Sequence, residues 1–292
     1  DATVAEFVAA HGRVPDSELV VLALGRLGGR ALTHASDLDL IYLFTGDHLA
    51  ESDGPRPLGA TTYYNRLAQR VTGAMSVPTA AGKLYDVDTR LRPQGAQGPL
   101  VVTVDSFERY QREEAWTWEH MALLRARPVY GSDAAKAEVQ RIIDDLLRVP
   151  RDPAKLAADA AEMRGKIAAH KPANGALDIK GGPGGLVDLE FAMQVTQLVS
   201  GQCHDPNISA ALACMKAAGL VPSGVIDAHG LLARMLVMLR PPPPEAEPPT
   251  AGARQLVASQ CGEPGWAQLL AAHVAARQEI ANWWASIRPG QE

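Results

Sequence analysis

Hydrophobic residues in the first 130 positions fall into short continuous runs separated by segments of helical repeat. A continuous apolar run over 19–24 predicts a buried strand, and a second run over 38–44 predicts another. Apolar positions spaced three and four residues apart predict helices over 3–11 and 62–75. Because strands and helices are mixed in this way, the pattern favours an α+β class.

A further strand is predicted over 83–92, where apolar and polar residues alternate strictly until Pro93 ends the run. The run over 100–104 predicts the next strand. One long helix is then expected over 105–124, with Asp105 at its capped beginning.

Strand signals disappear from Ser132 onward, where Ala, Leu and charged residues dominate. Helical periodicity is present in four segments, 133–147, 153–169, 186–199 and 268 to the end. We therefore place a boundary after residue 130, with a mixed domain over 1–130 and an all-helical domain over 131–292. The proline-rich segment near 241–249 predicts a mobile loop.

Charge and composition narrow the function classes. The net charge of −5 and the pI of about 5.9 leave no general basic field, so neither a nucleic-acid polymerase nor any nucleic-acid partner is expected. No apolar run reaches the roughly 18 residues of a membrane span. The three cysteines, Cys203, Cys214 and Cys261, lack CxxC spacing, which predicts reduced thiols and a cytoplasmic protein. The chain begins at Asp1, as expected for part of a longer protein.

The candidate chemistry lies in a glycine-rich stretch, 25–29, that precedes Asp37 and Asp39. A turn free of side chains lets backbone N–H groups approach a phosphate. Carboxylates two residues apart on a strand point to the same face, where they can share a divalent metal ion. Without a cation, burying two adjacent carboxylates would cost several kcal/mol. This combination indicates nucleotidyl transfer.

A third carboxylate would complete such a metal site, and Asp88 on the strand over 83–92 is the natural candidate, with Asp86 as its competitor. Four arginines follow on the same or later segments and suit phosphate oxygens: Arg90, Arg92, Arg125 and Arg127. The alternative interpretation is that the aspartates are solvated strand ends and the arginines are surface charges.

Several sequence blocks, taken together and in order, resemble bacterial glutamine synthetase adenylyltransferase, a bifunctional enzyme that also removes adenylyl groups. The blocks are GRLGG (25–29), SDLDLI (36–41), VDTRLRP (87–93), RYQREEAWTWEH (109–120), RAR (125–127) and the stretch 178–191. The form of the 109–120 block resembles the C-terminal, adenylylating half of that enzyme.

The resemblance implies a nucleotidyltransferase-fold domain, with a mixed sheet flanked by helices, followed by a helical bundle. It implies transfer of AMP from ATP to a tyrosine of glutamine synthetase with Mg²⁺, under the control of glutamine and the PII signalling protein. Phosphorolytic removal of AMP and a non-catalytic module that senses PII or glutamine are the alternatives.

Roles for individual residues follow from the same resemblance. Asp37 and Asp39 would bind both of two metal ions, and Asp88 would complete the site and help to deprotonate the tyrosine. Phosphates would be held by Gly28, Gly29 and Ser36, and Arg90 and Arg92 would contact the triphosphate or the acceptor. Glu190 is a weaker candidate, because it lies on a polar stripe of an otherwise apolar helix.

Overall fold

The structure is a computed structural model that describes residues 2–33, 36–80, 82–83, 85–239 and 250–288. The chain divides into two compact units, one made of 1–149 with 204–208 and the other of 150–203 with 209–292. The proline-rich segment that we expected to be mobile, 241–249, lies outside the described residues. Among the described helices, none is long and apolar enough to cross a membrane.

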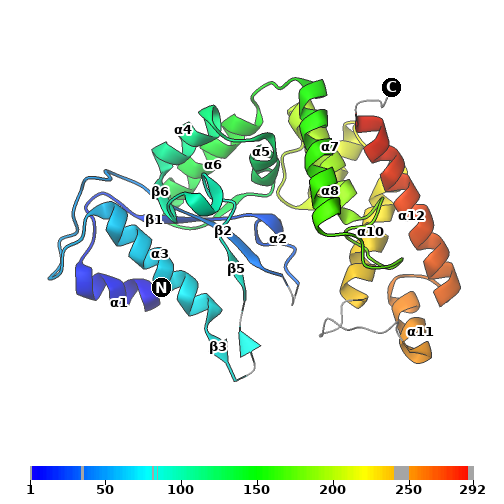
Figure 1. Ribbon diagram of the computed structural model, residues 1–292, viewed down its shortest axis with the longest axis horizontal. Helices are drawn as coiled ribbons and strands as arrows, with labels where there is room; N and C mark the ends of the chain where they lie inside the picture. The colour runs from blue at the N-terminus through cyan, green and yellow to red at the C-terminus, as the bar shows by residue number, and fades with distance from the viewer. Residues whose placement is uncertain (1, 34–35, 81, 84, 240–249, 289–292) are drawn as a thin grey trace. The chain divides into compact units, whose positions relative to one another are not determined.

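The first unit combines a mixed sheet with helices (Figure 1). Its helices are α1 (Ala2–His11), α2 (Gly25–Gly28), α3 (Ala60–Ser76), the 3-10 helix η1 (Gly95–Gln97), α4 (Val104–Glu113), α5 (Thr117–Leu123) and α6 (Asp133–Leu147). Its strands are β1 (Leu19–Ala23), β2 (Leu38–Phe44), β3 (Pro78–Thr79), β4 (Gly82–Lys83), β5 (Val87–Asp88), β6 (Val101–Thr103) and β7 (Arg127–Tyr130). The α+β class expected from the sequence is confirmed.

β2 is the central strand of the sheet. It pairs antiparallel with β1, and β1 pairs antiparallel with β7. On its other edge β2 pairs in parallel with β5 near its beginning and with β6 near its end. Because β5 pairs with the first two residues of β2, Asp88 of β5 lies beside Asp39 of β2.

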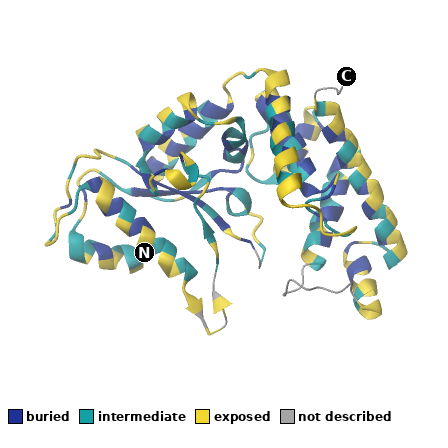
Figure 2. Ribbon diagram, viewed as in Figure 1, coloured by how far each residue is buried: buried dark blue, intermediate teal, exposed yellow. Residues whose placement is uncertain are grey.

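Helices cover both faces of this sheet, with α1 and α3 on one side and α4, α5 and α6 on the other (Figure 1). β1 and β2 are accordingly buried along nearly their whole length, as the dark band in Figure 2 shows, whereas the outer strands β5, β6 and β7 are only partly buried. Tyr42 illustrates the packing on the α3 side, because its ring is fully buried and its hydroxyl lies 2.9 Å from the Thr72 hydroxyl. Alternation along β2 therefore leaves Asp39 on the opposite face.

Tyr64 on α3 provides a test of this core. Its ring stacks on Phe44 with centroids 4.6 Å apart, and burial raises the pKa of Tyr64 from 10.0 to about 12. A phenol whose pKa is higher in the folded state stabilises the fold below pH 10 and loses that contribution as pH rises through 12. Across this window the unfolding free energy should fall by about 1.4 kcal/mol per pH unit more in the wild type than in Tyr64→Phe. Urea unfolding at a series of pH values measures the difference, and parallel curves for the two proteins would contradict it.

The prediction of one long helix over 105–124 is wrong, because the structure has two helices, α4 and α5, separated by residues 114–116. The cap is also different, since the Thr103 side chain, rather than that of Asp105, accepts the N–H of Ser106 at 3.0 Å. The break follows from a side-chain contact that periodicity does not report: the Glu119 carboxylate accepts the backbone N–H of Trp116 at 2.9 Å.

The strand expected over 83–92 is shorter than predicted, and only β5 of this segment joins the main sheet. The chain turns after Asp88 because the Arg92 guanidinium donates to backbone carbonyls of Thr89 and Pro99, at 2.8 and 3.1 Å. The strand β7 was not predicted at all. The glycine-rich stretch forms one turn of helix, α2, instead of an open turn.

α6 belongs to the first compact unit, since it packs against α4, α5 and β7. The first unit therefore extends to Val149, beyond the boundary that we placed after residue 130. Where one domain ends and the next begins stays a prediction.

The described part of the second unit contains only helices. They are α7 (Pro153–His170), α8 (Leu186–Ser200), α9 (Ile208–Ala217), α10 (Ser223–Met238), α11 (Ala251–Gln260) and α12 (Trp266–Ile287). α8 packs against α7, α10 and α12, which explains why it is apolar nearly all round. On its polar stripe, Gln197 is fully buried and donates to the Cys203 carbonyl at 2.6 Å. The role of Glu190, on the same stripe, stays a prediction.

A buried ion pair joins α7 to the start of α8. The Arg164 guanidinium donates to the Asp188 carboxylate and, at 2.8 Å, to the carbonyl of Gly181, while the N–H of Gly184 donates to Asp188 at 2.6 Å. Both side chains are at least nine-tenths buried. The pair thus fastens the second glycine-rich turn to the helical core.

Replacing Asp188 by Asn should lower the free energy of unfolding by about 3 kcal/mol, because it leaves the Arg164 charge buried without its counter-charge. Glu162→Gln is the matched control, since Glu162 pairs with Lys166 on the exposed surface of α7 and should change stability by less than about 0.5 kcal/mol. Urea denaturation measures both, and equal effects would contradict the assignment.

The expectation of reduced cysteines is wrong for two of the three. Cys203 and Cys214 form a disulfide, with Cα atoms 5.6 Å apart, while Cys261 is a buried free thiol. The chain reverses after α8 through Gly201, whose φ is 65°, and this reversal brings the two sulfurs together. The pairing depends on the reversal and not on CxxC spacing, which is why the sequence rule missed it.

Candidate functional site

Gly25 and Asp39 lie in direct contact at the end of β1. The N–H of Leu24 donates to the Asp39 carbonyl at 2.9 Å, and the next residue, Gly25, has a φ of 53°. A Cβ at Gly25 would collide with Asp39 Oδ2. The left-handed backbone favours glycine at this position, and any larger residue would also have to displace the Asp39 carboxylate.

The parallel register between β2 and β5 places a second carboxylate beside the first. Asp39 is the direct partner of Asp88, and the N–H of Leu38 donates to the carbonyl of Asp86 at 2.8 Å. Asp37 stands one residue before β2, on the same face as Asp39. Of the two competitors on the later strand, Asp88 is therefore the one in register with Asp39.

The neighbouring carboxylates act on the pKa of Asp39. Burial raises the pKa of Asp39, and the negative charges of Asp88 and Asp37 raise it further. Arg125 and Arg90 oppose this increase. A divalent cation bound here would neutralise the repulsion between this half-buried carboxylate and the two like charges beside it.

Asp88 has a different partner. The Arg90 guanidinium donates from Nε to both Asp88 oxygens, at 3.0 and 2.9 Å, and these bonds hold the pKa of Asp88 below its ordinary value. In the part of the chain that the structure describes, no three His, Cys, Asp or Glu side chains are placed to hold a metal ion together. The donor types fit Mg²⁺, but Asp88 would have to turn from Arg90 to join Asp37 and Asp39. The metal site thus stays a prediction.

Gly28 and Gly29 make contacts within the protein. Their N–H groups donate to the carbonyls of Leu24 and Gly25, at 2.9 and 3.1 Å, so both are used inside the α2 turn. A Cβ at Gly28 would collide with the carbonyl of Arg125. The absence of side chains here allows close packing, and a phosphate contact from these two amides stays a prediction.

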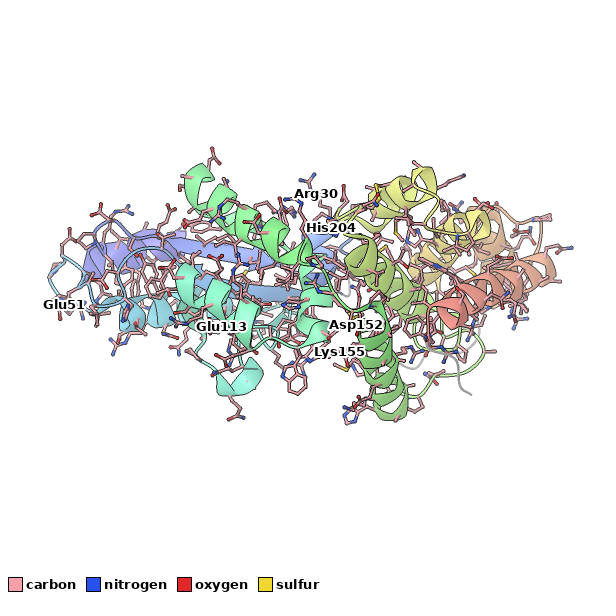
Figure 3. All side chains as sticks on the ribbon, turned by 90° about the horizontal axis from the view of Figure 1, so that it is seen from above. Arg30, Glu51, Glu113, Asp152, Lys155 and His204 are labelled. Carbon is pink, nitrogen blue, oxygen red and sulfur yellow. A yellow bond between two sulfur atoms is a disulfide. The ribbon has the colours of Figure 1, made fainter. Side chains whose placement is uncertain are left out.

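Two further contacts hold the end of this turn. Arg127 donates to the carbonyls of Leu27 and Gly28, each at 3.1 Å, and Asn207 donates to the carbonyl of Gly29 at 3.1 Å. Figure 3 labels Arg30 and His204, which mark the two segments that meet in this contact. Arg127 therefore supports the turn, whereas Arg125 acts on the Asp39 charge.

The remaining candidates divide into two groups. Arg90 lies with the carboxylates and is 79% exposed, so it can reach an incoming ligand. Arg92 is occupied by backbone carbonyls of its own loop, and Ser36 accepts the N–H of Thr33 at 2.9 Å while only 7% exposed. Sequence reasoning missed the need for Gly25, although its position directly after a strand and before the aspartate pair is a signal.

Comparisons with known proteins address the family of the chain. The family model described as glutamate-ammonia ligase adenylyltransferase matches residues 2–142. A Brucella suis biovar 1 protein is 50% identical over 199 residues, and a Rhizobium meliloti protein is 43% identical over 235 residues. Both are named bifunctional glutamine synthetase adenylyltransferase/adenylyl-removing enzyme. The chain belongs to the glutamine synthetase adenylyltransferase family.

The alignments to these adenylyltransferases cover only part of the length of each relative. The two alignments include 68% and 79% of this chain but 20% and 24% of the relatives, so the chain spans about a fifth to a quarter of their length. A second family model, described as GlnD PII-uridylyltransferase, matches residues 155–240, from within α7 to just after α10.

Proposed function

We propose that this chain transfers AMP from ATP to a tyrosine hydroxyl of glutamine synthetase and releases pyrophosphate. The observation that carries the proposal is the contact of Asp39 with Gly25 and its register with Asp88, which concentrates negative charge at the end of β1. Glutamine synthetase is the acceptor because the relatives are named for it. The resemblance of the 109–120 block supports the adenylylating half.

In this reaction the tyrosine oxygen forms a bond to the α-phosphorus of ATP while the bond from that phosphorus to the β-phosphate oxygen breaks. Asp37 and Asp39 would hold Mg²⁺, which neutralises charge on the phosphates when bound. Asp88, a carboxylate with an ordinary pKa of about 3.9, is ionised at neutral pH with or without Arg90, so it would be available to accept the tyrosine proton once it has turned from Arg90. Arg90, once released, would pair with phosphate oxygens.

The effectors and the cellular location are further parts of this proposal. PII and glutamine would act as effectors. The match of residues 155–240 to a PII-uridylyltransferase family supports a regulatory role for this helical segment. A cytoplasmic location, with ATP as the nucleotide, fits an enzyme that modifies glutamine synthetase.

A two-direction assay tests the proposal. The chain is incubated with glutamine synthetase, Mg²⁺ and ATP labelled in the α-phosphate, and separately with adenylylated glutamine synthetase and inorganic phosphate. We expect label on glutamine synthetase in the first reaction and no ADP in the second. ADP in the second reaction would show phosphorolytic removal instead. No product in either, with binding of PII or glutamine retained, would favour a non-catalytic module.

A further inference from the structure

The short segment 204–208 belongs to the first compact unit and supports the α2 turn. The N–H of Asn207 donates to the Asp205 carboxylate at 2.8 Å, and this bond turns the chain directly before α9. The Asn207 side chain donates to the Gly29 carbonyl at 3.1 Å, where the segments that carry Arg30 and His204 meet (Figure 3). A side chain 178 residues away in the sequence therefore holds the end of the turn.

The backbones of the two segments also approach each other closely. A Cβ on Gly29 would lie 2.7 Å from the Pro206 carbonyl oxygen, which is closer than a real Cβ comes to another atom. Gly29 caps the C-terminal end of α2, and α2 begins at Gly25, the residue that lies against the Asp39 carboxylate. The contact with Pro206 and Asn207 thus supports one end of a turn whose other end fixes the place of Asp39.

A disulfide encloses this segment in the sequence. Cys203 precedes it directly, and Cys214 lies on α9, which begins directly after Asn207. The Cys203 carbonyl is held in turn, because the buried Gln197 side chain donates to it at 2.6 Å. A cross-link that spans 11 residues restricts the conformations of the residues inside it, so less freedom is lost when Asn207 is held at Gly29.

The disulfide is accessible to thiol exchange, because Cys214 is exposed and Cys203 is half-buried. A thiolate of a dithiol reductant attacks one sulfur and breaks the S–S bond, and the second thiol of the reductant then releases the mixed disulfide. Both cysteines end as thiols, with two protons taken up, and the reductant ends as a disulfide. Cys261, the third cysteine of the sequence, is a buried free thiol and takes no part.

We infer that Asn207 is a positioning residue for AMP transfer, and that the Cys203–Cys214 disulfide makes its hold on the α2 turn sensitive to dithiol reductants. The effect on catalysis rests on the proposed function. Asn207 acts through the turn that carries Gly25, because its side chain bonds the carbonyl of Gly29. Reduction frees the segment 204–208, weakens this bond and lets the Asp39 carboxylate move from its place against Gly25.

Reduction with dithiothreitol is the first arm of the test, with the two new thiols counted by alkylation and mass spectrometry. We expect kcat for AMP transfer to fall about 5-fold with KM for ATP nearly unchanged, since misplacing a reacting group affects the chemical step. The amides of Arg30 and Ala31, which donate within the turn at 3.2 and 2.9 Å, should exchange with deuterium faster, while those of α3 should not change.

The double variant Cys203→Ser/Cys214→Ser controls for effects of the reductant on other components of the assay. It should have the kcat of the reduced chain and should not respond to dithiothreitol. A response equal to that of the wild type would show that the reductant acts elsewhere, and would overturn the inference.

Asn207→Ala tests whether the disulfide acts through this side chain. We expect kcat to fall about 10-fold, and reduction should then lower it by less than about 2-fold more, because the bond through which the disulfide acts is already absent. Asn65→Ala is the matched control, since Asn65 donates to the Thr61 carbonyl at 2.8 Å on α3. This control should keep the wild-type kcat and the wild-type response to reduction.

A merely structural role predicts a different pattern. Reduction and Asn207→Ala would then lower the melting temperature independently, and reduction would change kcat by the same factor in Asn207→Ala as in the wild type. That result would overturn the inference, and so would absence of the disulfide after air oxidation.

Unchanged exchange at Arg30 and Ala31 after complete reduction would also overturn it, whatever the activity. If the wild-type chain transfers no AMP, the proposed function fails by itself. The exchange of these two amides in oxidised, reduced and Asn207→Ala protein then still decides whether the disulfide and Asn207 hold the turn.

Discussion

Asp39→Asn is expected to abolish measurable AMP transfer, with a loss of at least about 1000-fold in kcat/KM. Asp39 is the carboxylate that contacts Gly25, pairs in register with Asp88 and has its pKa raised by burial and by two neighbouring negative charges. The amide removes the charge that a metal ion would bind. The fold should survive, since losing a repelled charge from a half-buried position relieves repulsion.

The measurement is transfer of labelled AMP from ATP to glutamine synthetase, with circular dichroism melts of each variant. Asp37→Asn should show a comparable loss, and Asp133→Asn is the control, because the Asp133 side chain is fully exposed and pairs with Lys136 on α6. Retained activity in Asp39→Asn or Asp37→Asn would contradict the assignment of the carboxylates.

Gly25→Ala should have the second largest effect, a loss of at least about 100-fold in AMP transfer. The added methyl would collide with the Asp39 carboxylate and would also force alanine into a left-handed backbone, with φ of 53°. Relief of the collision moves the carboxylate from its place, so kcat should fall even at saturating ATP. The backbone strain should lower the unfolding free energy by about 1 to 2 kcal/mol.

Gly73→Ala is the matched control for this change. Gly73 lies within α3, and a Cβ there would have no atom within 4 Å. Alanine should therefore be neutral or stabilise the helix by up to about 1 kcal/mol without altering activity. Steady-state kinetics and urea unfolding of the two variants separate the effects. Wild-type kcat in Gly25→Ala would show that the contact with Asp39 does not matter for catalysis.

Local hydrophobic pattern was enough to predict the central strands and most long helices. β1 is a continuous apolar run and β2 is apolar except at Asp39, because both faces of the sheet are covered, and the predicted segment 133–147 coincides with α6. The burial of one or both faces of an element sets the spacing of its apolar residues, so this spacing can be read from the sequence without knowledge of the fold.

Specific side-chain contacts account for what the hydrophobic pattern did not predict. The helix expected over 105–124 breaks where Glu119 takes the N–H of Trp116, and the strand expected over 83–92 stops where Arg92 binds the loop carbonyls. The disulfide between Cys203 and Cys214 likewise depends on a chain reversal. The first two contacts join residues three apart in the sequence and the disulfide joins residues eleven apart, and in each case a specific side-chain interaction decides the local conformation, which the hydrophobic period does not report.

For the site, alternation along a strand predicted the pairing of Asp37 with Asp39, because side-chain direction follows from period two alone. The choice between Asp86 and Asp88 needed the register of two strands that are distant in sequence. The sequence also cannot distinguish a glycine that approaches a phosphate from one that packs against a backbone, as Gly28 does against Arg125.

The most direct test of the central claim is a crystal structure of this chain with Mn²⁺ and a non-hydrolysable ATP analogue, with the metal located by its anomalous signal. The account predicts a metal ion about 2.1 Å from carboxylate oxygens of both Asp37 and Asp39, bridged to the triphosphate, with Asp88 turned toward it from Arg90. A metal and triphosphate bound elsewhere, with Asp39 making no contact to either, would contradict it.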